Sequence, residues 1–141
     1  MSQRRRPVTG EASVEQVREW CALAARAASD KKADDVVILA VGGILPAVTD
    51  AFVIASAPNA RLVRTIAEEV EARVKEGGGP SPLHIEGLDD ARWVLLDYGD
   101  FVVHVFLDEV RTFYDLERLW ADAPRWEWEL VDGPGGRAPQ E

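Results

Sequence analysis

The chain has 141 residues, of which 47% are hydrophobic and 29% charged, the balance of one globular domain with a real core. Acidic side chains number 25 against 16 lysines and arginines, which gives a formal net charge of −9 at pH 7. An acidic body of this kind repels phosphate backbones. The charge therefore argues against a protein that reads DNA, and it favours a basic protein as partner.

The cysteine count and the hydropathy of the chain indicate its cellular compartment. A single cysteine, Cys21, leaves no internal disulfide and no thiolate zinc cluster, and it fits a reducing environment. No run approaches the roughly 18 uninterrupted apolar residues of a membrane span, and no secretory apolar stretch follows the basic N-terminus. We therefore expect a cytoplasmic protein without a membrane partner.

Composition divides the chain into three regions. Residues 1–12 show no periodicity and are predicted to be a flexible arm, in which Arg4-Arg5-Arg6 is the basic cluster. Residues 13–124 are predicted to form a single domain. Residues 125–141 include Asp132-Gly133-Pro134-Gly135-Gly136 and are predicted to be a tail, largely disordered.

The first half of the domain is predicted to run helix, strand, strand, helix. Ser13 followed by Gln16 is a capping box that starts a helix up to residue 30. Its inward stripe is Val14, Val17, Cys21, Ala24 and Ala28. The β-branched runs 35–41 and 51–56 suit strands buried on both faces. Asn59 is a good N-cap for a second long helix, which the glycines 77–79 end. Its inward stripe is Leu62, Ile66, Val70 and Val74 (or Val63).

The second half is predicted to run strand, strand, strand, helix. Residues 83–86 can be a short strand, and the strands 92–97 and 101–106 flank Tyr98-Gly99 as a two-residue turn. A last helix covers about residues 109–120, with Phe113, Leu116 and Trp120 on one side. This order predicts an α/β fold, a mixed sheet of about five strands flanked by helices.

The predicted hairpin has two unlike faces. A turn at Tyr98-Gly99 would pair six residues on one face: Asp97 with Asp100, Leu95 with Val102, and Trp93 with His104. The other face is apolar and therefore the natural core side: Val94, Leu96, Phe101 and Val103. The first face is aromatic in its middle and acidic near the turn, as interaction surfaces often are. A helix of the same domain could equally cover Trp93.

Acidic residues concentrate in the segment that contains this hairpin. Residues 86–122 hold ten acids and three arginines, a net charge of −7. Such a run is often no more than a solvated surface. The sharper interpretation is a field that steers a basic protein towards the hairpin.

Catalytic motifs are absent from the sequence. There is no glycine-rich phosphate-binding motif and no nucleophile elbow, and neither His84 nor His104 has a second metal ligand at a suitable spacing. A lone strand histidine such as His104 is usually packed and hydrogen-bonded. Asp50 after a glycine pair resembles the start of a nucleotidyltransferase site, but the second acid two residues on is missing. We expect no metal, no cofactor and no catalysis.

The chain resembles the ribosomal silencing factor (Iojap-related) family over about residues 13–124. The first half carries the run TDAFVIAS at residues 49–56, then Arg61 and the helix through residues 66–70. The second half is closer still: Glu86-Gly87, WVLLDYGD at residues 93–100, VHVF at 103–106 and FYDLERLW at 113–120. The arm, residues 77–82 and the tail depart from the family pattern, and Trp126 and Trp128 have no place in it.

The resemblance implies a nucleotidyltransferase-like fold without the catalytic acids. It also implies a translational repressor that acts when nutrients are short. Such a protein binds the large ribosomal subunit through ribosomal protein L-fourteen and sterically prevents the small subunit from joining. A homodimer is a further implication. The expected partner-binding residues are Trp93, Val94, Leu95, Asp97, Tyr98, Asp100 and His104.

Two other hypotheses stay open at the level of sequence. One is a divergent metal-dependent nucleotidyltransferase that uses Asp50 with a non-standard acid set. The other is a dimeric scaffold unrelated to ribosomes, in which Arg4-Arg5-Arg6 serves as an adaptor or contacts RNA.

Overall fold

The computed structural model describes residues 12–44 and 48–129. The elements in chain order are α1 (Val14–Asp30), β1 (Asp34–Ala40), β2 (Ala51–Ala57), α2 (Ala60–Glu76), β3 (His84–Glu86), β4 (Trp93–Asp97), β5 (Phe101–Leu107), α3 (Asp108–Tyr114) and α4 (Leu116–Leu119). The predicted α/β class and order of elements are confirmed. None of the helices in the described ranges has the length and apolar character needed to cross a bilayer.

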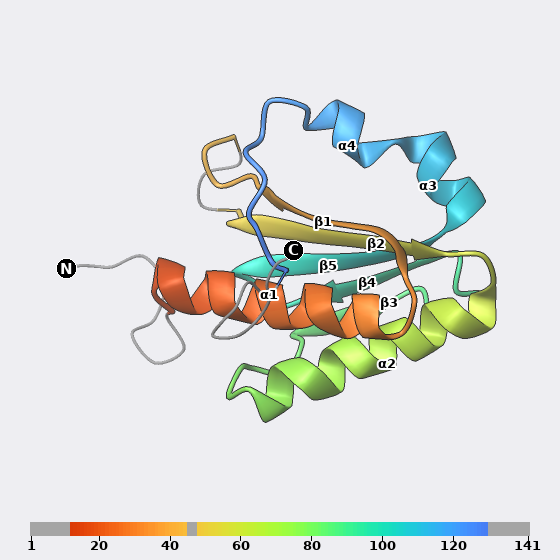
Figure 1. Cartoon of the computed structure of the whole chain (residues 1–141), viewed down its shortest axis with the longest axis horizontal. Coiled ribbons are helices and arrows are strands. Elements are labelled where there is room, and N and C mark those ends of the chain that lie inside the picture. Colours follow the sequence, from red (N-terminus) through yellow and green to blue (C-terminus); the bar gives the residue numbers. More distant parts are fainter. Residues whose placement is uncertain (1–11, 45–47, 130–141) are drawn as a thin grey trace, which may run out of the picture.

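The five strands form one mixed sheet in the order β1-β2-β5-β4-β3. Strands β2 and β5 are parallel, and the other neighbouring pairs are antiparallel. Helices α1 and α2 pack side by side on one face of the sheet, and α3 and α4 lie across the other (Figure 1). The sheet is therefore the middle layer of three, and its two faces bury two separate apolar clusters.

Both long helices begin as the sequence predicts. The Ser13 hydroxyl accepts the backbone N–H of Gln16 over 3.1 Å, and the Gln16 side chain accepts the backbone N–H of Ser13. The Asn59 side chain accepts the backbone N–H of Leu62 over 2.8 Å. The predicted stripe of α1 is wrong at one end, because Val14 in the first turn is 60% exposed and burial begins at Val17.

The hairpin between β4 and β5 turns one residue later than the sequence predicts. Tyr98 donates its backbone N–H to the carbonyl oxygen of Phe101 over 2.9 Å, so the two turn residues are Gly99 and Asp100. Gly99 has φ +85°, which glycine adopts without steric cost. Across the strands, Trp93 pairs with Phe106, not with His104.

This error moves each partner by two residues, which is one full period of side-chain alternation. Leu95 is opposite His104, and Asp97 is opposite Val102. Trp93, Leu95, Asp97 and His104 therefore still share one face of the sheet. Asp100 leaves that face, because it lies in the turn.

The predicted last helix is two short helices. Asp115 adopts a left-handed conformation (φ 50°, ψ 57°) and separates α3 from α4. The buried Arg111 bridges this break through an ion pair with Glu117. Its guanidinium also donates to Ser56 Oγ over 3.0 Å and to the carbonyl oxygen of Asp34 over 3.2 Å. One cation thus ties both short helices to β1 and β2.

Residues 124–129, here called the edge strap, lie along the outer edge of β1. The sequence places most of this segment in a disordered tail, and for residues 125–129 the structure differs. Three hydrogen bonds join it to β1: Ala40 N to Pro124 O (2.7 Å), Trp126 N to Ile38 O (3.0 Å) and Trp128 Nε1 to Val36 O (3.2 Å). The Arg18 guanidinium lies 4.7 Å from the centre of the Trp126 ring. Residues 130–141 are outside the described part of the chain.

Candidate partner-binding face

Helices α3 and α4 cover only half of the sheet face on which they lie. On the β1–β2 side they bury a compact apolar cluster: Leu39, Val41, Ile54, Phe106, Val110 and Ala123. On the β4 side the outward-facing residues Trp93, Leu95 and Asp97 are only partly buried, as is Val102 of β5. We call these four residues the open face.

An aromatic cluster marks the border between the two halves. The Trp93 ring lies 4.8 Å from Phe106 and 5.0 Å from Tyr114 of α3, centre to centre. Tyr114 is 51% exposed, so the cluster reaches the surface. The aromatic side chains of β4 and α3 thus form a continuous apolar margin beside the open face.

Below Trp93, His104 is buried with 6% of its surface exposed. The indole Nε1 of Trp93 donates to His104 Nδ1 over 3.1 Å. Burial lowers the pKa of His104 from 6.5 to about 4, so the imidazole is neutral at pH 7. Because Nδ1 accepts, the single proton of the ring is on Nε2, which has no hydrogen-bond partner among the described residues.

Three of the seven predicted contact residues lie together on the open face, and four do not reach it. Trp93, Leu95 and Asp97 are brought together as predicted. The other four are buried: Val94 (0% exposed), Tyr98 (4%), Asp100 (9%) and His104 (6%). These four residues therefore have little exposed surface in this structure.

His104 lies beneath Trp93, and the other three have different surroundings. Val94 alternates onto the opposite face, among the residues that α1 and α2 cover. Tyr98 stacks on Phe101 with ring centres 4.5 Å apart, and burial raises the pKa of its hydroxyl. Asp100 lies in the turn, where its carbonyl oxygen accepts the backbone N–H of Asp50 over 2.9 Å.

The aromatic residues that sequence reasoning missed are Phe52, Phe106, Tyr114 and Trp120. Phe106 could have been found, because it lies two residues beyond His104 on the same strand and therefore on the same face. Phe52 contacts His104 edge-on at 4.9 Å and Trp120 at 5.8 Å. These contacts join distant parts of the chain, so no local sequence pattern predicts them.

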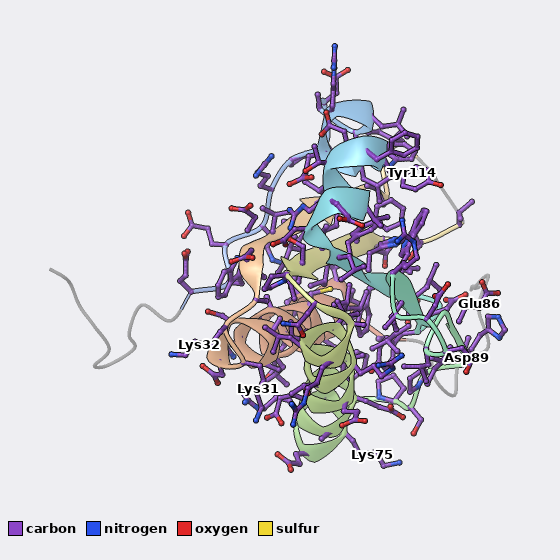
Figure 2. All side chains as sticks on the ribbon, turned by 90° about the vertical axis from the view of Figure 1, so that its right-hand side faces the viewer. Lys31, Lys32, Lys75, Glu86, Asp89 and Tyr114 are labelled. Atoms are coloured by element: carbon purple, nitrogen blue, oxygen red, sulfur yellow. The ribbon has the colours of Figure 1, made fainter. Side chains whose placement is uncertain are left out.

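Carboxylates lie on and beside the open face. Figure 2 shows Tyr114, Glu86 and Asp89 projecting on one side and Lys31 and Lys32 on the other. Glu86 is exposed and contacts His84 over 2.6 Å, beside the open face on β3. Asp97 is partly exposed, and its carboxylate accepts the backbone N–H of Gly99 over 2.8 Å. The open face therefore holds one carboxylate and has another beside it on β3, which suits a basic partner.

The described residues contain no group of three or more His, Cys, Asp or Glu side chains that could hold a metal ion. Cys21 is buried in α1, and burial raises the pKa of its thiol, as expected for a small core residue. The basic cluster Arg4-Arg5-Arg6 lies outside the described residues.

The molecule is a small α/β domain with helices on both faces of a five-stranded mixed sheet, and one of these faces is uncovered over β4. The chain belongs to the ribosomal silencing factor family, because the family model described as "Ribosomal silencing factor during starvation" matches residues 14–140. This confirms the resemblance seen in the sequence.

Individual relatives agree. "Ribosomal silencing factor RsfS" of Halalkalibacterium halodurans is 43% identical over 81% of this chain and 96% of its own length. "Protein Iojap, chloroplastic" of Zea mays is 31% identical over 70% of this chain and 42% of its own length. A crystal structure of a Chromobacterium violaceum protein has a TM-score of 0.70 at 35% identity, and the match covers 74% of this chain and 86% of that one.

Proposed function

We propose that this protein is a non-enzymatic, cytoplasmic translational repressor that binds the large ribosomal subunit. Its contact is ribosomal protein L-fourteen, and its effect is to keep the small subunit from joining, especially when nutrients are limited. Family membership supports the ribosomal role. The partner and the steric mechanism are what the family resemblance implies, and both suit the chemistry of the open face.

The observation that carries the proposal is the half-uncovered aromatic face. Trp93 is a large ring at the edge of a packed cluster, with Leu95 beside it and Asp97 towards the turn. Central tryptophans are common anchors of protein interfaces, and flanking carboxylates orient a basic partner and speed its approach. A folded domain bound at the joining face of a subunit excludes the other subunit by its volume alone, so no reaction is needed.

The exposed surface of each predicted contact residue supports a smaller contact set in our proposal. Trp93, Leu95 and Asp97 touch the partner, and Tyr114 extends the apolar margin. Val94, Tyr98 and Asp100 support the face from below. A homodimer would be a further use of the same surface, and sedimentation of the purified protein alone reports it.

Sedimentation of purified subunits tests the proposal. Large subunits incubated with the protein should fail to form joined ribosomes when small subunits are added. Trp93→Ala should weaken binding by about 2 kcal/mol, roughly thirtyfold, and restore joining. Val14→Ala truncates an exposed apolar side chain on the far side of the sheet and should change neither result.

Three outcomes would contradict the proposal. The first is undisturbed joining at saturating wild-type protein. The second is unfolding of Trp93→Ala, which would place that side chain in the core rather than at the interface. The third is turnover of a nucleotide with Mg²⁺, which would favour an enzyme.

A further inference from the structure

We propose that His104 is a positioning residue, which holds the Trp93 indole in the orientation that binds the partner without touching the partner itself. The inference rests on the proposed function, in which Trp93 is the anchor. The expected role of His104 thereby changes from a contact residue to a support beneath the contact.

The strand register shows that this hydrogen bond needs a particular orientation of the indole. Trp93 is directly opposite Phe106, whereas His104 is opposite Leu95. To bring Nε1 within 3.1 Å of His104 Nδ1, the indole must lean diagonally along β4 towards Leu95. Its contact with Phe106 alone does not fix that lean, because an aromatic ring can pack on its neighbour in several orientations.

His104 is placed to be a fixed acceptor. Phe52 contacts it edge-on at 4.9 Å, and Phe106 lies nearly parallel to it at 6.1 Å, so uncharged rings hold it on two sides. With 6% of its surface exposed, it has almost no area left for a partner. Burial also keeps its pKa near 4, so Nδ1 retains its lone pair throughout the neutral range.

An imidazole at this position lowers the stability of the fold. Its Nε2–H is buried and has no acceptor among the described residues. A buried donor without a partner destabilises a fold, and an apolar ring of similar shape would avoid that penalty. The advantage of histidine over an apolar ring is therefore a hydrogen bond of defined direction. It supplies one acceptor that a phenylalanine lacks, and that acceptor faces the one indole on the open face.

A fixed indole should bind better than a mobile one. Interface side chains lose rotamer freedom when they bind, and a side chain that is already ordered loses less. One net hydrogen bond corresponds to roughly a fivefold change in an equilibrium constant. We therefore expect His104→Phe to weaken binding of the large subunit about fivefold, without any loss of thermal stability.

The experiment compares wild type, His104→Phe, His104→Asn, Trp93→Phe and the double variant Trp93→Phe/His104→Phe. Three quantities are measured in each: the ¹H–¹⁵N signal of the Trp93 indole, the affinity for large subunits and the melting temperature. Trp93→Phe assigns the indole signal by deleting it. His104→Asn can restore an acceptor close to the position of Nδ1, so it should recover part of both the signal position and the affinity.

Support requires that His104→Phe shifts the indole signal, weakens binding in the wild-type background and has no effect in the Trp93→Phe background. An equal loss in both backgrounds would overturn the inference, because His104 would then act independently of the indole. Unchanged affinity with a shifted signal would also overturn it. If His104→Phe does not fold, the histidine is structural and the inference fails, unless His104→Asn folds and retains signal and affinity.

Failure of the inference can be told apart from failure of the proposed function. If Trp93→Ala leaves ribosome binding intact, the open face is not the contact and the proposed function fails at this surface. In that case the indole signal still reports whether the hydrogen bond to His104 exists. If Trp93→Ala abolishes binding but His104→Phe does not weaken it, only the positioning role is wrong.

Discussion

One face of the sheet is closed over β1 and β2 and open over β4. On the closed side, α3 and α4 bury Leu39, Ile54 and Phe106 completely. On the open side, Trp93 and Leu95 keep part of their surface in solvent, although both alternate onto the same face as the buried residues. Trp93 and Leu95 are as apolar as the buried residues, so their exposure reflects where the two short helices lie, whereas the charged Asp97 is also suited to solvent.

The same asymmetry is found at the two edges of the sheet. The edge strap covers the outer edge of β1 with backbone hydrogen bonds. The other edge is β3, a strand of three residues whose side chains His84 and Glu86 are exposed. Short, charged edge strands discourage uncontrolled pairing with other chains. The molecule therefore leaves the β4 side of one face uncovered, while the edge strap covers the β1 edge of the sheet.

The largest loss of stability should come from removing Arg111, the buried cation that holds α3 and α4 against the sheet. Arg111→Ala leaves Glu117 without its partner and removes the bonds to Ser56 and Asp34, so the free energy of unfolding should fall by about 4 kcal/mol. Urea unfolding measures this. Arg118→Ala, an exposed arginine on α4, is the matched control and should change stability little. If the free energy of unfolding changes equally little in Arg111→Ala and Arg118→Ala, the packing of α3 and α4 on the sheet does not depend on the buried ion pair.

The dependence of stability on pH tests whether His104, beneath Trp93, is buried and neutral. The pKa of His104 is about 4 when folded and near 6.5 when unfolded, so between these values the unfolded chain binds more protons. The contribution of the neutral His104 to the free energy of unfolding is therefore complete above pH 6.5. It is lost as the pH falls towards 4, which lowers the free energy of unfolding by about 3 kcal/mol. Carboxylates titrate in the same range, so the difference between wild type and His104→Phe isolates this slope. Identical slopes would contradict a buried, neutral imidazole.

The edge strap can be tested through its first tryptophan. Trp126→Ala removes the contact with the Arg18 guanidinium and the packing on the α1 side of the sheet, and it should cost about 2 kcal/mol of stability. Thermal unfolding is the readout. Glu127→Ala, the exposed neighbour, should be neutral. Ribosome binding should survive in both variants, since the strap is remote from the open face.

The smallest effect concerns charge at the open face. Asp97→Asn removes the carboxylate charge but keeps an oxygen that can accept the Gly99 N–H. Association with the large subunit should slow two- to threefold at low salt, and the difference should shrink as salt screens the field. Glu76→Gln, an exposed acid at the end of α2, is the control for net charge. Equal slowing in both variants would mean that overall charge matters and the position of Asp97 does not.

The predictions failed where distant parts of the chain meet. The later turn at Gly99-Asp100 reflects the pairing of Tyr98 with Phe101, whose rings stack within the core. The break at Asp115 lies in a segment that reads as one continuous helix, and the ion pair between Arg111 and Glu117 closes across it. The strap could not be foreseen, because Trp126 and Trp128 find their partners on β1 and α1, far away in the sequence.

Local signals in the sequence determined the order of the elements, both helix starts and which side of the hairpin belongs to the core. Capping side chains and alternating apolar residues act over a few positions, so the chain carries that information everywhere along its length. Only the tertiary structure decided that Val94, Tyr98, Asp100 and His104 lie beneath the surface while Trp93, Leu95 and Asp97 reach it. Burial depends on what packs against a residue: α1 and α2 cover the face that holds Val94, whereas the rings of Phe52, Trp93 and Phe106 surround His104.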